Sequence, residues 1–418
     1  MLHFLLPSRG HGWRKRIRPA YSISQMLLTL LIGMACLTSL RGQEFQPGTT
    51  YHGSSGYIEY LAGEVPLIIS VPHGGRLEPV DIPDRDCEGC VYVQDSYTLE
   101  LAREIGAAYI RQTGCHPHIV YNLLHRKKLD MNRDVVEATD SNETSAVYWN
   151  DYQGFVNAAK DSILARFGKG LFIDLHGHGH TKQRIEYGYL LYGSQLRESD
   201  SMLNTVKRIQ TSSIRSLVST NRRNHSHAEL LRGDLALGTM FADRGFPGVP
   251  SRQDPFPLAD DAYFNGGYNT VAHGSKPGGS IDAIQMELYS AIRFNTAQRA
   301  AFADAFATVL RRYLEEHYFE SFVQSSCSVT STLNMKQANI KVAPDPASDV
   351  ITVWLDDDVG MEHRLHIVDL LGRTLITHSS ATLPVQLDVR ALAPGTYSLQ
   401  VVTPTATAAH TQPILIVR

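Results

Sequence analysis

The sequence has 418 residues, of which 43% are hydrophobic and 19% are charged, and its formal net charge at pH 7 is −3. A chain of this length and composition can bury a large core and is long enough for more than one domain. The near-neutral charge gives no electrostatic reason to expect binding to nucleic acid or to an anionic membrane surface.

Residues 1–42 have the pattern of a secretory signal peptide. Four basic residues between positions 14 and 18 precede an uncharged stretch from Met26 to Leu37, and small residues follow it. The apolar stretch is short for a membrane span, so a retained anchor is the less favoured interpretation. In an oxidising compartment, Cys87 and Cys90 are expected to form a loop disulfide and not a metal site.

Strand-like and helix-like segments alternate from about Tyr57 to Val323. The expected strands are 66–71, 119–123, 171–175, 186–192 and 283–288, and the expected helices are 96–111, 148–167 and 297–319. This alternation predicts a catalytic domain over residues 43–323, with helices on both faces of a mixed sheet in an α/β/α sandwich.

The composition changes after this region. Residues 324–339 are rich in Ser, Thr and Asn and read as a linker. The remaining residues, 340–418, alternate short apolar strands with turn residues, which predicts a small all-β sandwich of the immunoglobulin-like kind. The expected strands there are 340–342, 350–355, 364–369, 374–377, 384–388, 396–402 and 413–417.

Two of the expected central strands lead directly into a histidine, His73 and His176. Open α/β sheets bind their ligands at the carboxyl ends of such strands, so the two imidazoles are expected to meet there. A catalytic zinc ion takes nitrogen ligands and a carboxylate and keeps one position open for water. The alternative for either histidine alone is a hydrogen bond that caps a strand end.

The third ligand of such a zinc ion should be an acid, either Asp95 or Glu78. We favour Asp95, although it could also cap the helix that follows it. His178 and His180 follow His176 in a loop, where indirect or solvated roles are expected to outweigh direct ligation.

Four further residues are candidates for the chemistry. Asn132 and Arg133 lie in a polar segment after a strand and could clamp a substrate carboxylate, although a surface loop is the alternative. Arg126 in the same segment is a further candidate for substrate binding. Glu287 lies in an apolar strand, where a carboxylate is costly without a partner or a task. A general base is one such task, and a structural ion pair is the alternative.

Five segments together resemble the N-formylglutamate amidohydrolase family over roughly Val65 to Arg293. They are Ser70–Gly75, Asp130–Arg133, Asp174–Gly177, Gly266–Thr270 and Gln285–Leu288. That family shares its sheet architecture with the zinc carboxypeptidases.

The resemblance implies that His73 and His176 bind zinc, that Arg133 binds a carboxylate and that Glu287 activates water. It also makes Tyr268, Asn269 and Thr270 candidates for substrate binding. Carboxypeptidases carry their acidic ligand three residues after the first histidine, where this chain has Arg76, so the resemblance does not identify the third ligand.

The C-terminal region is similar to the sorting domain of type IX secretion, on the segments Val342–Asp349, Leu370–Arg373 and Leu392–Tyr397. The resemblance implies the outer-membrane secretion machinery as a partner, and a location outside a Gram-negative cell or on its surface. Asp345 replaces the asparagine that is usual in this domain.

We therefore expect a secreted zinc amidohydrolase that cleaves an amide bond in an N-acyl amino acid or a small peptide-like substrate. A carboxypeptidase or a cell-wall peptide amidase is the alternative among enzymes. A surface binding protein that keeps the fold without catalysis is the alternative from another class.

Overall fold

The computed structural model describes residues 45–321, 327, 340–355, 363–369, 373–380, 384–402 and 410–417. The chain divides into two compact units, one ending at Cys327 and the other beginning at Ser328. The predicted signal peptide, 1–42, lies outside the described residues, and so does the predicted linker, 324–339, apart from Cys327.

One mixed sheet of eight strands organises the first unit, in the order β1-β2-β4-β3-β5-β8-β6-β7. Strands β4, β3, β5 and β8 are parallel, whereas β6 runs antiparallel to β8, and β1 and β2 form an antiparallel edge. The carboxyl ends of β3, β5 and β8 therefore lie side by side at one edge of the sheet. The strands are β1 Thr50–His52, β2 Ile58–Leu61, β3 Leu67–Val71, β4 His118–Asn122, β5 Gly170–Gly177, β6 Ile185–Gly188, β7 Gly248–Val249 and β8 Ile281–Leu288.

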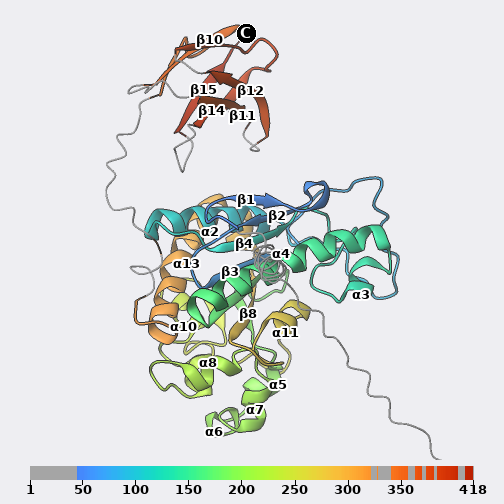
Figure 1. Ribbon diagram of the computed structural model, residues 1–418. Helices are drawn as coiled ribbons and strands as arrows, with labels where there is room; N and C mark the ends of the chain where they lie inside the picture. The colour runs from blue at the N-terminus through green and yellow to red at the C-terminus, as the bar shows by residue number, and fades with distance from the viewer. Residues whose placement is uncertain are drawn as a thin grey trace, which may run out of the picture. The chain divides into compact units, whose positions relative to one another are not determined.

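Helices cover both faces of this sheet, because alternate side chains of its buried strands point to opposite faces. The odd-numbered residues of β3 belong to the core shared with α2 (Thr98–Thr113) and α13 (Thr296–His317). Ile68 belongs instead to the core shared with α4 (Glu143–Phe167). In Figure 1, α4 lies in front of the strands, and α13 lies beside α2. The predicted three-layer α/β fold is confirmed.

Short helices connect the larger elements, and α5 to α8 gather at one end of the unit in Figure 1. They are η1 Ser54–Gly56, α3 Val135–Thr139, α5 Gly193–Leu196, α6 Asp200–Leu203, α7 Val206–Thr211, α8 Arg215–Thr220, α9 His227–Arg232, α10 Leu237–Ala242, α11 Tyr268–His273 and α12 Ser290–Phe294.

Two boundaries of predicted elements in the first unit are displaced by more than two residues, each for a local reason. Strand β6 stops at Gly188, before the predicted end at 192, because Leu190 has a left-handed backbone with φ 62° that a strand cannot continue. Helix α4 begins at Glu143, before the predicted start at 148, because the side chain of Asn142 accepts a hydrogen bond from the Ser145 N–H at 2.9 Å and caps the helix.

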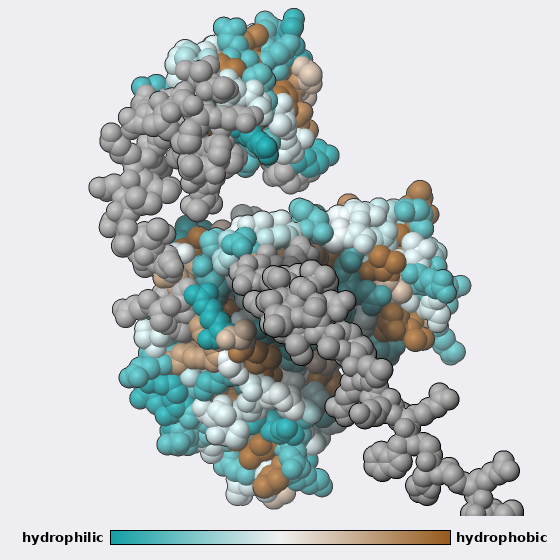
Figure 2. Space-filling view, in the orientation of Figure 1, coloured by the Kyte–Doolittle hydropathy of each residue, from teal (hydrophilic) through white to brown (hydrophobic). Residues whose placement is uncertain are grey.

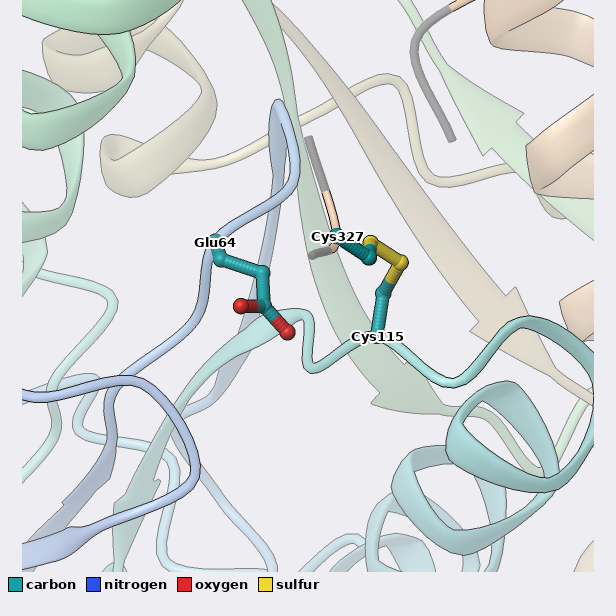
Figure 3. Close-up of side chains that lie close together, drawn as sticks. All are labelled: Glu64, Cys115 and Cys327. Atoms are coloured by element: carbon teal, nitrogen blue, oxygen red, sulfur yellow. A yellow bond between two sulfur atoms is a disulfide. The ribbon is translucent and has the colours of Figure 1, made fainter. Parts of the chain in front are cut away.

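Two disulfides join the four cysteines of the first unit that the structure describes. Cys87 pairs with Cys90, which confirms the predicted loop disulfide. Cys115, which follows α2, pairs with Cys327, whose Cα atom lies 5.5 Å away. Figure 3 shows the carboxylate of Glu64 beside this second disulfide. The three residues cannot form a metal site, because a metal needs thiolates and these sulfur atoms are bonded to each other.

The second unit consists of two antiparallel sheets, as predicted. Strands β13-β10-β9 form one sheet and β12-β11-β14-β15 form the other. The two sheets enclose an apolar core to which Ile351, Val353, Ile367 and Leu399 contribute. The strands are β9 Ile340–Ala343, β10 Val350–Leu355, β11 His363–Val368, β12 Thr374–Ser380, β13 Val385–Asp388, β14 Gly395–Val402 and β15 His410–Ile416.

The described surface mixes polar and apolar residues. Hydrophobic residues lie in separate patches among hydrophilic ones on the face shown in Figure 2. Among the helices that the structure describes, none is both long enough and apolar enough to cross a bilayer.

Candidate functional site

The ends of two neighbouring parallel strands bring His73 and His176 together. Strands β3 and β5 pair in the register Ser70 opposite Asp174, so His73 just beyond β3 and His176 near the end of β5 reach the same edge. Their ring centroids are 4.8 Å apart, and both residues are buried. The meeting of the two histidines follows from the parallel pairing of β3 and β5.

Asp95 is the acid that lies with these histidines. Its Oδ2 atom is 3.4 Å from His73 Nδ1 and 3.1 Å from His176 Nδ1. The Asp95 N–H donates to the carbonyl of His73 at 3.1 Å, which fixes the loop that carries the carboxylate. Glu78, the other candidate, is half exposed and pairs with Lys127 at 2.6 Å. The structure thus brings Asp95 to the histidines and leaves Glu78 outside the group.

Both histidines are held from behind by buried carboxylates. His73 Nε2 lies 2.6 Å from Asp130 Oδ1, and His176 Nε2 lies 2.9 Å from Asp174 Oδ2. An ionised carboxylate only accepts hydrogen bonds, so Asp130 and Asp174 each accept the Nε2–H of one ring, and Nδ1 of each ring is left facing Asp95. A carboxylate behind a histidine in this way is the usual support of a metal-binding imidazole.

The two supporting carboxylates are themselves anchored. Asp130 also accepts from the Arg126 Nε–H at 2.9 Å and from the Asn132 N–H at 3.0 Å. Asp174 accepts from the hydroxyl of Ser70 at 2.7 Å. These bonds fix the orientation of both imidazole rings before any ligand arrives.

The three convergent donors fit a metal ion. One ligand atom each from His73, Asp95 and His176 lie within 4.8 Å of one another, and His73 Nδ1 is buried without a hydrogen-bond partner. Burial would raise the pKa of Asp95, but the two imidazoles hold it far below its usual value. A buried carboxylate that faces two imidazole nitrogens is stabilised by positive charge, which protonated rings or a bound cation supply, and two nitrogens with one oxygen are a ligand set of catalytic zinc.

Glu287 lies directly beside this group. Strands β5 and β8 pair in the register His176 opposite Glu287. The Glu287 carboxylate accepts from the Gln285 side chain at 3.0 Å. Burial raises the pKa of Glu287 to about 8; the charge of His176 opposes this shift, and Asp95 and Glu186 add to it. The residue therefore has the position and the proton affinity of a general base, once a cation favours its charged form.

A cavity of about 720 Å³ opens over these residues. Among the predicted site residues, its lining includes His73, Asp95, Arg126, Asn132, Arg133, His176 and Glu287. The guanidinium of Arg133 bonds Glu137 through Nε at 2.6 Å and the Asn132 carbonyl through Nη1 at 2.8 Å. Its Nη2 has no partner among the described residues, so it remains for a substrate.

Of the residues predicted from the Gly266–Thr270 segment, Asn269 and Thr270 lie deeper than the cavity, whereas Tyr268 is partly exposed. Asn269 and Thr270 are fully buried at the start of α11, and neither they nor Tyr268 line the cavity. The Asn269 N–H donates to Asn132 Oδ1 at 2.9 Å, and its side chain donates to Asp174 at 3.2 Å. Asn269 thus positions other site residues, and Gly266 and Gly267 supply the cavity wall of this segment.

Three further histidines lie in the cavity wall or in the core on the other side of the sheet. His178 and His180 line the cavity. His273 bonds the Gln153 side chain at 2.8 Å and packs on Phe172, in the core beneath α4. Our sequence reasoning assigned no role to Gln285 or Arg293, although both line the cavity. Gln285 points to the same face of β8 as Glu287, so the alternation of side chains along this strand could have identified it as a cavity residue.

Residues 341–416 match the family described as the secretion system C-terminal sorting domain. This match confirms the resemblance found for the tail and identifies a protein that is exported to the cell surface or beyond it. No curated protein matches the sequence.

Among the solved structures that resemble parts of the chain are the following three. N-formylglutamate amidohydrolase from Ralstonia eutropha JMP134 is 13% identical, with 65% of this chain and 98% of that chain covered and a TM-score of 0.38. The CwlD amidase from Clostridioides difficile, solved with the GerS lipoprotein, is 10% identical, with 60% and 98% covered and a TM-score of 0.23. PorZ, a surface component of the type IX secretion system of Porphyromonas gingivalis, is 20% identical, with 22% and 13% covered and a TM-score of 0.17. Likenesses this distant say nothing about the reaction, which must be judged from the residues.

Proposed function

We propose that this protein is an exported zinc-dependent hydrolase that cleaves an amide bond in an N-acyl amino acid or a small peptide-like substrate. The observation that carries the proposal is the convergence of His73 Nδ1, His176 Nδ1 and the Asp95 carboxylate beside Glu287. All four side chains line one cavity, so a substrate that enters it meets the ligands and the base together.

His73, Asp95 and His176 would hold the zinc ion. When bound, such an ion polarises a carbonyl group and lowers the pKa of a water molecule to about 7. Asp130 and Asp174 keep the Nε2 protons of the two imidazoles, so that Nδ1 of each ring stays free to bind the ion. This division of the ring nitrogens is the contribution of the buried carboxylates to the site.

Glu287 would take a proton from the attacking water and pass it to the leaving nitrogen. Its carboxylate is close enough to the ligand group for the charges of His176 and Asp95 to shift its pKa. The environment that raises its pKa also makes it a stronger base than an exposed glutamate.

Arg133 and Asn132 would hold the substrate. The free Nη2 of Arg133 offers a cation to a carboxylate, and the side chain of Asn132, 3.4 Å from His176 Nε2, lines the same cavity. Arg126 lies 4.0 Å from Asp95 but is bonded to Asp130, so it serves the charge balance of the site first and the substrate second. A bound carboxylate next to the cleaved amide suits an N-acyl amino acid, a carboxypeptidase substrate and a cell-wall peptide alike.

The metal ligands provide the test. His73→Ala and His176→Ala should each remove most of the zinc measured by elemental analysis, and hydrolysis with it, while the fold remains. His52→Ala, an exposed histidine on β1, serves as the control and should keep the zinc. Asp95→Asn and Glu78→Gln should separate the two candidate acids, with zinc lost only from the first. Full zinc occupancy in both histidine variants would contradict the assignment.

A panel of N-acyl amino acids, short peptides and muropeptides identifies the substrate class. Release of a free amino acid from the acyl compounds would support the proposed amidohydrolase. Cleavage of C-terminal residues only, or of muropeptides only, would favour the alternative enzymes. A zinc-free protein that binds these compounds without turnover would favour the non-catalytic binding protein.

A further inference from the structure

A buried glutamate next to the candidate site holds two cavity-lining residues in a stack. The rings of His180 and Phe264 have centroids 4.7 Å apart at an interplanar angle of 16°. Glu186 accepts from His180 Nδ1 at 2.8 Å through Oε1 and from the Phe264 N–H at 2.8 Å through Oε2. Glu186 is fully buried, so one carboxylate fixes both partners of the stack.

The same histidines do not form a second metal site. His178, His180 and Glu186 come close enough for one, but both nitrogens of His178 are used by the backbone. Its Nε2 bonds the Arg184 carbonyl at 2.9 Å, and its Nδ1 accepts the His180 N–H at 3.1 Å. Both oxygens of Glu186 are likewise engaged with the stacked pair. What these residues build is therefore a fixed surface and not a ligand set.

This surface stands beside the proposed base. Strands β6 and β8 pair in the register Glu186 opposite Glu287, and His180 and Phe264 line the same cavity as Glu287 and His176. Phe264 is 43% exposed although one face of its ring is covered by His180. A large apolar ring that stays exposed on the wall of a polar cavity offers its free face to whatever the cavity binds.

We propose that the stacked pair of His180 and Phe264 is a specificity-determining platform that binds a flat apolar side chain of the substrate next to the cleaved amide. The inference rests on the proposed function and names the class of substrate: an N-acyl amino acid or peptide with an aromatic side chain. Phe264 and His180 contact that side chain, and Glu186 is a positioning residue that acts through both. Aromatic rings favour stacked and edge-to-face contacts with one another over contacts with a methyl group.

The experiment measures binding to the full-length, zinc-loaded protein with Glu287→Gln, which holds substrate without cleaving it under the proposed function. N-acetyl-L-phenylalanine and N-acetyl-L-alanine are titrated by calorimetry. We expect the phenylalanine compound to bind at least about 3- to 10-fold more tightly. Phe264→Ala and Glu186→Gln, added singly, should abolish most of this preference with the zinc content unchanged. Phe264→Tyr should restore it, because it retains the ring.

Two further variants serve as comparisons for Phe264→Ala. Tyr192→Ala removes an aromatic residue that is 64% exposed and does not line the cavity, so the preference should persist. Phe294→Ala removes the other exposed phenylalanine of the cavity wall, which packs edge-on against Tyr97. Equal binding of the two compounds, a preference that survives Phe264→Ala, or one that is lost only in Phe294→Ala would overturn the proposal.

The outcome is separable from that of the proposed function. Turnover of N-acetyl amino acids by the wild-type protein tests the hydrolase, and the ratio of the two affinities tests the platform. A preference for the phenylalanine compound without turnover would leave the platform standing and refute the hydrolase. Turnover of both compounds with equal affinities would support the hydrolase and refute the platform.

Discussion

The two units of the molecule differ most in what they bury. In the first unit, five carboxylates are buried around the carboxyl ends of the central strands: Asp95, Asp130, Asp174, Glu186 and Glu287. In the described part of the second unit, His363 is the one polar or charged side chain that is buried, and the rest of the core is apolar.

Buried carboxylates cost free energy unless they have partners, so a fold that serves only stability avoids them. In the first unit, hydrogen bonds, imidazoles and, as we propose, a metal ion offset this free-energy cost. The second unit has the apolar core of a module that is recognised through its surface. The contrast assigns chemistry to the first unit and export to the second, and the following predictions test that division.

The largest effect is expected from Glu287→Gln, which keeps the shape of the residue but removes the base. Loss of a general base lowers the rate by about 10²- to 10⁴-fold. Zinc content and melting temperature should stay unchanged. Asp282→Asn is the matched control, because it removes another buried carboxylate from the same strand, away from the cavity. A Glu287→Gln enzyme within about tenfold of the wild-type rate would assign the base elsewhere.

A smaller effect is expected from Asp174→Asn, which removes the charge behind His176 but leaves the ligand itself. Loss of such a supporting group weakens metal affinity by about 10- to 100-fold. Competition with a chelator of known affinity measures the change. Asp304→Asn, at an exposed ion pair with Arg111, should leave the zinc affinity as it is. An unchanged affinity in Asp174→Asn would mean that Asp174 serves packing alone.

The acid stability of the first unit should depend on its buried neutral histidines. Burial lowers the pKa of His118 to about 3, and its Nδ1 accepts hydrogen bonds from the Tyr60 hydroxyl at 2.7 Å and the Gly63 N–H at 3.1 Å. Between pH 6.5 and about 3, the unfolded chain binds a proton at this residue that the folded protein refuses. Stability is therefore lost as the pH falls through this window, by about 1.4 kcal/mol per pH unit.

His118→Asn should flatten that dependence. Asparagine can accept the same two hydrogen bonds but takes up no proton in this range. Urea unfolding of the zinc-free protein between pH 4 and 6, followed by circular dichroism in the near ultraviolet, measures the slope. An identical slope in the variant would show that His118 does not contribute to the acid sensitivity.

The smallest effect on turnover is expected from removal of residues 340–418. Without the second unit, the purified protein should hydrolyse its substrate at the wild-type rate, because each of the residues that we assign to the site lies between His73 and Glu287. In the cell, the same deletion should leave the protein in the periplasm, as fractionation would show. A folded, zinc-loaded truncation without activity would break the division of labour between the two units.

Local sequence patterns predicted the central strands and the long helices of the first unit and the strands of the second unit, but not β1, β2, β7 or the short helices. They also predicted which residues stand at the ends of the central strands. His73, His176 and Glu287 could be identified because strand alternation and parallel pairing bring them to one edge. The end of β6 could not be predicted from the sequence, since it depends on the left-handed backbone of Leu190.

The sequence did not predict clearly which acid is the third candidate ligand, because the position of Asp95 depends on how the chain folds back toward the histidines. Asp95 reaches the histidines through a loop that is fixed by the bond of its N–H to the His73 carbonyl and by the bond of the Gln94 side chain to the Gly74 carbonyl, and no local pattern distinguishes it from Glu78. Glu186 was overlooked as a site residue for a similar reason. Its partners His180 and Phe264 lie far apart from each other in the sequence and meet only in the folded protein, where both hydrogen-bond to Glu186.

The disulfide between Cys115 and Cys327 has a mechanical consequence for an exported chain. A tail that is gripped by secretion machinery pulls on the protein at the point where it leaves the fold. Tension that enters at Cys327 passes through a covalent bond to Cys115, in the short loop between α2 and β4, before it reaches α13. The load therefore falls on the interior of the sheet, where strands must be sheared apart together, and not on the last helix, which could be peeled away turn by turn.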